Sequence, residues 1–412
     1  MKKALILSVG TGTRPDTNIV NPLFKTIKNS RPDYVGFLVS TDSRKFALEI
    51  LDRFEPDEYE HGIVDLPNPD KIDEVFLAAN RLIRDLMAAG YACEDIAVDY
   101  TSGTKAMTAG LVLSAVAYSC GELKYITGQR RNGVVIDGTE QFLTISPSAI
   151  LAHRELRIAR RLILAYRFNS ALDLLGGLNT ALLDDYDQCL LENLLHIARA
   201  YLCWDKFDHA RFRGEYNQVD FTLWEMTEFQ IDPLTNACLK SVMEAMKKGR
   251  LNEDVLADLY NNAARRHEEG KYDDAMARMY RLLEMLGQWA LSSHGLNSSD
   301  LDPAGLSPDL QSALSVNRDP ADGRIKIGLI KTWQVLADLG SDMGRAILED
   351  QALRARLNSR NYSILAHGTR PVEEKECRSL LQLIRDYLVR FVPEAEERLS
   401  RLRFPWSKNQ SD

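Results

Sequence analysis

The chain has 412 residues, of which 45% are hydrophobic and 27% are charged, and its formal net charge is −8. This length predicts two or three domains with separate hydrophobic cores, and the composition excludes the collagen-like and low-complexity classes. The acidic total argues against non-specific coating of duplex nucleic acid, although it is compatible with a local basic cleft.

The N-terminal stretch MKKALILSVG combines two lysines with a short apolar run. We expect a β-strand there rather than a signal peptide, because polar residues follow directly and no small-residue cleavage pattern is present. The longest apolar stretch near a helix, residues 106–117, is too short to span a bilayer, so no membrane contact is expected. The six cysteines show no CxxC pairing. We therefore predict a cytoplasmic, reducing compartment and no metal site.

Strand and helix signals alternate over residues 1–148. Strands are expected at 3–9, 35–39, 61–66, 95–100, 123–126 and 134–136, and helices at 72–89 and 105–119. The last two strands are expected to form a hairpin around Arg130-Arg131-Asn132-Gly133, because Asn-Gly is a strong turn dipeptide. Alternation of this kind predicts a mostly parallel sheet covered by helices.

From about residue 150 onward, helical periodicity replaces the strand signals. Three related segments, 167–171, 206–210 and 271–275, each place an aromatic residue before an Asn or Asp. We expect helix–helix turns there, with the Asn or Asp capping the next helix. Residues 292–324, rich in Ser, Asp, Pro and Gly, are predicted to form a long loop. Helices are expected near 327–339, 343–367 and 372–391.

The expected organisation is therefore an α/β domain followed by all-α domains. The sheet domain covers residues 1–148, a helical connecting domain covers 149–249, a second helical domain covers 250–405, and 406–412 are expected to be a disordered tail. The boundary between the helical domains is placed where Lys247-Lys-Gly-Arg250 interrupts the periodic pattern.

Three turns at the carboxyl ends of the predicted strands carry polar residues: Gly10-Thr-Gly-Thr-Arg14, Ser40-Thr-Asp42 and Thr101-Ser-Gly-Thr-Lys105. In an open α/β sheet, ligands bind outside these strand ends. Hydroxyls, free backbone N–H groups and a lysine at a helix N-terminus suit a phosphate. The alternative is that Gly and Thr only form tight turns, and for the Gly10 turn both interpretations stay open.

Neither glycine-rich turn fits a nucleotide fingerprint. The Gly10 turn lacks the third glycine or alanine of the dinucleotide motif because Pro15 occupies that position, and neither turn fits GxxxxGK[ST]. The sequence thus disfavours a redox or NTP-using enzyme on the sheet domain.

The segment Asp99-Tyr-Thr-Ser-Gly-Thr-Lys-Ala-Met107 resembles the D-x-T-[GS]-G-T-K-x-M signature of CARF domains, the sensors of CRISPR-associated type III defence proteins, with Ser102 replacing the commoner glycine. The resemblance implies a Rossmann-like fold, a homodimer and a cyclic oligoadenylate bound across the two-fold axis. It assigns these residues to the ligand pocket: Gly10, Thr11, Gly12, Thr13, Thr41, Thr101, Ser102, Gly103, Thr104, Lys105 and Met107. Some CARF domains slowly cleave their own activator, and the sequence leaves that activity open here.

Arg360 and His367 lie seven residues apart in the stretch NSRNYSILAHGTRP. On one continuous helix their azimuths differ by only about 20°, so the two side chains would share a face. Gly368 and Pro371 predict that this helix ends directly after His367, where the helix dipole favours an imidazolium. A histidine suits proton transfer, and an arginine suits a phosphate that gains charge.

This spacing resembles the R-x(4–6)-H motif of HEPN ribonucleases, and its place downstream of a CARF-like signature matches the order in CRISPR-associated CARF–HEPN ribonucleases. The resemblance covers roughly residues 1–145 and 250–395. It implies cleavage of single-stranded RNA without metal or cofactor, by attack of the ribose 2′-hydroxyl, leaving a 2′,3′-cyclic phosphate. Arg360, His367 and Asn361 would form the site, completed by a second chain. Local positive charge would come from Arg354, Arg356 and Arg370.

The sequence thus predicts a cyclic oligoadenylate-activated endoribonuclease of antiviral defence. The alternative is a cyclic-nucleotide-binding regulatory protein whose helical domain is non-catalytic, with His367 bonded to a carbonyl and Arg360 paired with a carboxylate. A further polar cluster, Asn262, Arg265, Arg266 and His267, is expected mainly to be a solvated helix face, with a supporting role at the site as the lesser alternative.

Overall fold

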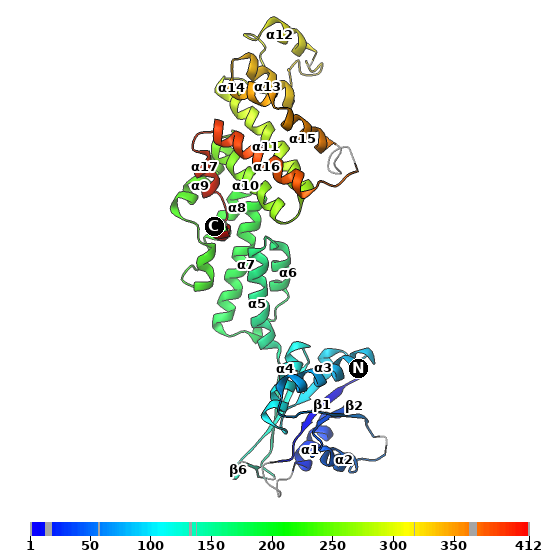
Figure 1. Cartoon of the computed structure of the whole chain (residues 1–412). Helices are drawn as coiled ribbons and strands as arrows, with labels where there is room; N and C mark the ends of the chain where they lie inside the picture. Colours follow the sequence, from blue (N-terminus) through cyan, green and yellow to red (C-terminus); the bar gives the residue numbers. More distant parts are fainter. Residues whose placement is uncertain are drawn as a thin grey trace. The chain divides into compact units, whose positions relative to one another are not determined.

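The computed structural model describes residues 2–12, 19–56, 58–131, 134–136, 138–316, 318–361 and 369–410. It contains two compact units (Figure 1). The first comprises Met1–Arg157 with Leu178–Gln188, and the second comprises Ile158–Gly177 with Cys189–Asp412. The predicted boundary at residue 249 therefore lies inside the second unit.

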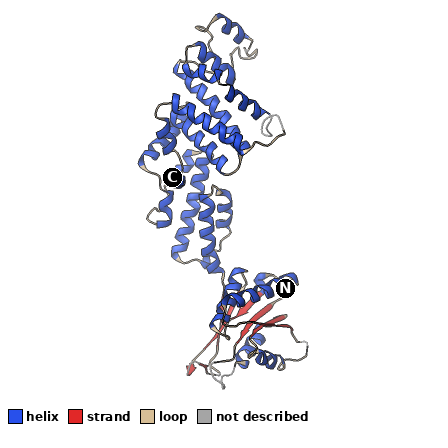
Figure 2. Cartoon of the chain, in the orientation of Figure 1, coloured by secondary structure: helices blue, strands red, loops and turns tan. Residues whose placement is uncertain are grey.

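A six-stranded sheet forms the centre of the first unit, and Figure 2 shows its strands in red. Its strands are β1 (Ala4–Val9), β2 (Tyr34–Val39), β3 (Glu60–Asp65), β4 (Ile96–Asp99), β5 (Glu122–Thr127) and β8 (Gln141–Ile145). Their order is β3-β2-β1-β4-β5-β8. Strands β1 to β5 run parallel, and β8 runs antiparallel to β5. The predicted mostly parallel sheet is confirmed.

Helices cover both faces of this sheet. The cores place α1 (Val20–Ser30) and α2 (Arg44–Leu51) on one face, and α3 (Ile72–Ala88) and α4 (Lys105–Ala117) on the other. Along β1, Leu5 and Leu7 pack into the α1/α2 core, whereas Ile6 packs into the α3/α4 core. Because both faces are buried, the central strands are nearly continuous apolar runs.

The predicted pairing of strands 123–126 and 134–136 is wrong. Strand β5 pairs with β8, through five residue pairs that include Leu123 with Ile145. The chain between them forms a separate two-stranded ribbon of β6 (Arg130–Arg131) and β7 (Val134–Val135), with two residue pairs. The longer strand provides more backbone hydrogen bonds to β5 than the short ribbon could, so the Asn-Gly signal marked a local turn rather than the edge of the sheet.

The second unit is helical. From α5 onward the helices are α5 (Ser148–Leu164), α6 (Phe168–Gly176), α7 (Asp185–Asp205), α8 (His209–Tyr216), α9 (Pro233–Lys247), α10 (Glu253–Glu268), α11 (Tyr272–Ser293), α12 (Pro308–Ser315), α13 (Leu329–Asp338), α14 (Asp342–Glu349), α15 (Gln351–Asn361), α16 (Glu374–Phe391) and α17 (Ala395–Arg401). Helices α10, α11 and α16 pack against one another. Among the described residues, no helix combines the length and the apolar character that crossing a membrane requires.

Two of the predicted helical boundaries differ from the structure. The expected loop 292–324 contains α12, which begins at Pro308; proline is favoured at the first helical position, so it does not mark a loop there. The expected helix 343–367 is divided between α14 and α15 at Asp350, whose backbone is extended. The Asp350 carboxylate accepts a hydrogen bond from the Leu353 N–H (2.9 Å), as an N-terminal cap does.

The three related turn segments share only part of the predicted capping. Asp208 caps α8, because its carboxylate accepts from the Arg211 N–H at 3.2 Å. In the other two segments the helix begins at the aromatic residue, so Asn169 and Asp273 lie inside the first turn and do not cap it. Asp273 instead accepts a hydrogen bond from the backbone N–H of Val372 (3.3 Å).

The predicted disordered tail is wrong as far as residue 410, because Pro405–Gln410 form a 3₁₀ helix. Trp406 is only 6% exposed. Its ring centroid lies 4.6 Å from that of Tyr201, and its indole N–H donates to the Leu164 carbonyl at 3.0 Å. A buried tryptophan contributes a large apolar area to a core, which explains why the chain is ordered so close to its end.

Candidate functional site

The candidate ligand site lies at the carboxyl ends of β1, β2 and β4. The chain leaves β1 towards β2 and β3 on one side, whereas β4 and β5 lie on the other side. The strand order therefore reverses between β1 and β4, and open α/β sheets bind ligands at such a switch point. The turn after β1 begins at Gly10 and the turn after β4 contains Ser102, so two of the three predicted turns meet at this place.

Gly10 and Gly103 are in close contact. A Cβ atom on Gly10 would lie 2.7 Å from the Cα and N atoms of Gly103. The Gly10 N–H donates to the Ser102 hydroxyl at 3.1 Å, and the Ser8 hydroxyl donates to the Ser102 carbonyl. Gly103 has φ = +119°, a conformation that favours glycine. The two turns are thus locked together by residues that have little or no side chain.

Asp99, the first residue of the signature, holds the turn after β4 from within the core. Its side chain is fully buried and accepts a hydrogen bond from the Thr101 N–H (2.7 Å). Burial raises the pKa of this carboxyl above its ordinary value, and the hydrogen bonds of Thr101 oppose that rise. The Thr101 hydroxyl in turn accepts from the Ile126 N–H on β5 (2.9 Å). Asp99 and Ser8 were absent from the predicted site residues, and only the signature could have indicated Asp99.

The N-terminus of α4 points its first residues at this site. Thr104 is its cap, because the Thr104 hydroxyl accepts from the Met107 N–H at 3.2 Å. Lys105 is exposed in the first turn, and within the described part of the chain its ammonium has no hydrogen-bond or ion-pair partner. A free ammonium beside a positive helix end suits an anion.

Met107 does not have the position that the resemblance assigned to it. It is only 1% exposed and belongs to the core between the sheet, α3 and α4. The reason is helical geometry, because the third residue of α4 turns its side chain towards the sheet. Met107 therefore supports the turn from beneath and does not line its surface.

The remaining predicted ligand residues are less constrained. Thr11, Gly12 and Thr41 are exposed, and Gly12 has φ = +81°. Thr41 follows β2, whose Val39 is in register with Val9 of β1, so its turn is the neighbour of the Gly10 turn. Thr13 lies outside the described residues.

The candidate cleavage segment is described only in part. Arg360 and Asn361 are the last two residues of α15, and His367 lies outside the described residues. The shared face of Arg360 and His367 therefore stays a prediction. Before this segment, Arg356 on α15 donates to the Ser379 hydroxyl of α16 (3.0 Å). After it, Arg370 pairs with Glu373 (3.3 Å) and Glu376 (3.2 Å).

The cluster on α10 is not a solvated face, so that prediction is wrong. Asn262, Arg265 and Arg266 are buried against α7. The Asp205 carboxylate accepts from Asn262 (3.0 Å) and Arg265 (3.0 Å), and it also pairs with Arg266. Burial by itself would raise the pKa of Asp205, but the two guanidinium groups hold it below its ordinary value. A carboxylate on a neighbouring helix cannot be recognised from the sequence of α10 alone.

No group of three or more His, Cys, Asp or Glu side chains in the described part of the chain is arranged to hold a metal ion. The site at the switch point offers backbone N–H groups, hydroxyls and one free ammonium. Chemically, this set can bind phosphate oxygens.

Comparison with known proteins identifies the C-terminal helices. Residues 247–390 match the family described as the Csm6 HEPN domain. This span holds both Arg360 and His367, and the predicted HEPN domain is confirmed. No curated protein sequence matches the chain.

Among solved structures, Csm6 from Enterococcus italicus bound to cyclic hexa-2′-fluoro-hexa-dAMP is similar over 100% of both chains, with a TM-score of 0.52 and 14% identity. That similarity confirms the predicted fold, a sheet domain followed by helical domains.

Two partial similarities are too low to support an argument. A type III CRISPR defence DNA nuclease activated by cyclic oligoadenylate has a TM-score of 0.26 and 14% identity, over 52% of this chain and 29% of that one. Can2 from Sulfobacillus thermosulfidooxidans in complex with cyclic tetra-adenylate has a TM-score of 0.23 and 10% identity, over 50% and 67%.

Proposed function

We propose that this chain, which has the fold of Csm6 and whose residues 247–390 match the Csm6 HEPN domain family, is an endoribonuclease of type III CRISPR defence that a cyclic oligoadenylate activates. The observation that carries the proposal is the pairing of two features in one chain. The HEPN match includes Arg360 and His367, and the CARF-like turn 101–105 lies at the switch point of the sheet.

The switch-point site is proposed to bind the activator. Its locked turns present backbone N–H groups and hydroxyls, and Lys105 adds a positive charge that no described carboxylate neutralises. A cyclic oligoadenylate carries one phosphate per nucleotide, so these groups match its backbone. The similar Csm6 structure from Enterococcus italicus holds a cyclic hexanucleotide analogue, which supports the same class of ligand here. We propose a homodimer, in which the second chain completes the ligand site.

Cleavage is assigned to Arg360 and His367. The imidazole of His367 would move the proton of the ribose 2′-hydroxyl or of the leaving 5′-oxygen. Arg360 would donate hydrogen bonds to the phosphate oxygens as their charge increases, and Asn361 would position the RNA. The products would be a 2′,3′-cyclic phosphate and a 5′-hydroxyl, formed without a metal ion.

The two sites would be coupled only if the activator binds the cleaving arrangement more tightly than the resting one. A ligand with equal affinity for both states shifts no equilibrium. Helices α5 and α7 each begin in the first unit and end in the second, so they are the covalent connections through which such a preference would act.

The test measures cleavage of a fluorescent single-stranded RNA by the full chain in EDTA, with and without cyclic hexa-adenylate. Arg360→Ala and His367→Ala are expected to lower the stimulated rate by about 10²-fold or more. Arg345→Ala and His294→Ala are matched controls, since both side chains are exposed on other segments, and these variants should cleave like the unmodified chain. Stimulated cleavage that survives in His367→Ala would refute the catalytic assignment.

A further inference from the structure

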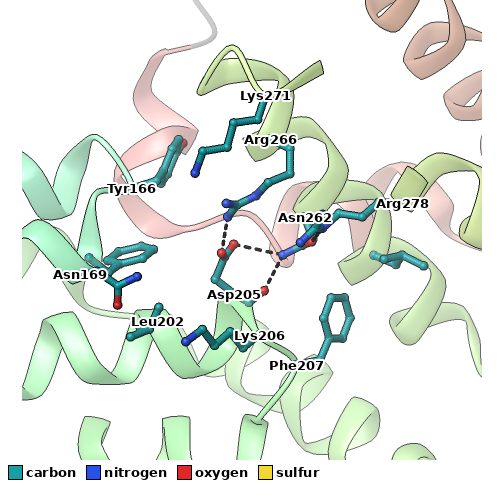
Figure 3. A pocket seen from close by; sticks show the side chains of 12 residues that line it. Tyr166, Asn169, Leu202, Asp205, Lys206, Phe207, Asn262, Arg266, Lys271 and Arg278 are labelled. Atoms are coloured by element: carbon teal, nitrogen blue, oxygen red, sulfur yellow. Dashed lines mark hydrogen bonds and ion pairs between the residues drawn. The ribbon is translucent and has the colours of Figure 1, made fainter. Parts of the chain in front are cut away.

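A pocket of about 490 Å³ lies within the second unit, where α6, α7, α10 and the start of α11 meet (Figure 3). It is separate from the switch-point site, which belongs to the first unit. Figure 3 shows Asp205 near its centre, with Arg266, Lys271 and Lys206 reaching it from three different segments. No role of the proposed ribonuclease uses this pocket.

The floor of the pocket contains buried positive charge. Arg266 is 7% exposed, pairs with Asp205, and contacts Glu269 at 2.6 Å. Within the described structure its Nε atom is buried and has no hydrogen-bond partner. A buried guanidinium nitrogen without an acceptor is costly, and an anion in the pocket would supply that acceptor.

The mouth of the pocket adds further bases. Lys206 and Lys271 are exposed lining residues. Lys271 contacts Glu269 at 2.8 Å, whereas Lys206 has no ion-pair partner in the described part of the chain. The pocket lining contains four basic side chains and one acidic one, and the carboxylates that pair with the bases, Glu269 and Asp274, do not line it. A chain of net charge −8 therefore turns bases towards this one hollow.

Aromatic side chains form part of the wall. Tyr166 and Phe207 line the pocket and are half-buried. The Tyr166 hydroxyl donates to Glu268 (2.7 Å), which holds the ring in place. Proteins that bind single-stranded nucleic acid combine positive charge for the backbone with aromatic rings on which bases stack.

The pocket also lies close in the chain to the proposed cleavage segment. Lys271 immediately precedes α11, and Asp273 in the first turn of α11 accepts from the N–H of Val372 (3.3 Å). Val372 follows His367 by five residues. One turn of helix thus connects the mouth of the pocket to the end of that segment.

We propose that this pocket binds the phosphate of a nucleotide, supplied either by the single-stranded RNA substrate or by a free nucleotide. The choice of RNA as one source rests on the proposed function, whereas the chemistry of the pocket does not. Arg266, Lys206 and Lys271 bind the phosphate oxygens, and the aromatic wall takes the base.

The experiment measures binding to the full chain carrying His367→Ala. The probes are a fluorescent 2′-O-methyl oligoadenylate, whose anisotropy is titrated at several salt concentrations, and adenosine monophosphate, read out by the thermal shift it produces. Lys206→Gln with Lys271→Gln removes two rim charges and keeps most of each side-chain stem. Lys240→Gln is the control, because Lys240 is exposed on α9 and does not line the pocket.

The double variant is expected to weaken binding of at least one probe by about tenfold or more. If the oligonucleotide is the ligand, the slope of log K against log salt falls by about 1.4, or about 0.7 per lost contact on a single strand. The probe whose binding is lost identifies the source. Equal affinity of the double variant, the control and the parent for both probes would overturn the proposal.

The unfolding temperature without ligand is expected to be equal in the double variant and the parent, since both lysines are exposed. A lowered temperature with unchanged probe binding would also overturn the proposal, by assigning these lysines a purely structural role. Because binding is measured without cleavage, failure of this proposal is separable from failure of the ribonuclease assignment, which the cleavage assay tests.

Discussion

Replacing Gly10 with alanine tests whether contact between the two turns forms the ligand site. The added Cβ would lie 2.7 Å from the backbone Cα and N atoms of Gly103, whereas carbon contacts are normally about 3.5–4.0 Å. Backbone atoms cannot rotate away, so the turns must separate by about 1 Å. Such overpacking costs about 1–3 kcal/mol. Loss of the hydrogen bond from Gly10 to Ser102 (3.1 Å) adds about 1 kcal/mol.

Urea unfolding and activator titration measure both consequences of Gly10→Ala. The free energy of unfolding should fall by about 2–4 kcal/mol, the sum of these two terms, and affinity for cyclic hexa-adenylate should fall with it because the turns no longer meet. The control is Gly214→Ala in α8, where nothing lies within 4 Å of the added Cβ; it should stabilise the helix by about 0.5–1 kcal/mol. A Gly10→Ala variant as stable as the parent, with equal affinity, would refute this reasoning.

Three further outcomes are expected. Asp205→Ala leaves two buried arginines without their carboxylate and should lower the free energy of unfolding by about 3–5 kcal/mol, whereas Glu49→Ala, in an exposed ion pair, should change it by less than about 1 kcal/mol; equal effects would contradict the buried network. Asp99 binds its proton more tightly when folded, because burial raises its pKa, so stability should fall as pH rises from about 4. Asp99→Asn should flatten that profile in urea unfolding, and an unchanged profile would count against this cause. Lys105→Ala should weaken activator binding about tenfold in calorimetry without lowering the unfolding temperature; unaltered affinity would exclude its ammonium from the site.

The sheet domain could be predicted from the sequence because its strands are buried on both faces. Stretches such as 4–9 and 34–39 are therefore continuous apolar runs, ended by glycine or serine at the turn. Strand β8 was missed because all five of its residues are exposed in this chain, so no burial pattern marks it. The short ribbon β6–β7 then attracted the pairing that β8 makes.

The candidate sites were predicted unequally for a similar reason. The turn 101–105 follows a strand and opens a helix, and such local order is visible in the sequence. The buried pairing of Asp205 with α10 joins residues about sixty positions apart, and no periodicity reveals that kind of contact. Met107 shows the converse, since a motif position can serve the core rather than the ligand.

The central claim is that a cyclic oligoadenylate switches on RNA cleavage by Arg360 and His367. The most direct measurement follows a fluorescent single-stranded RNA in EDTA with cyclic tri-, tetra- and hexa-adenylate in turn. We predict that one of these rings raises the cleavage rate of the full chain and yields 2′,3′-cyclic phosphate ends, and that His367→Ala abolishes the response. Absence of stimulation by all three rings would contradict the account.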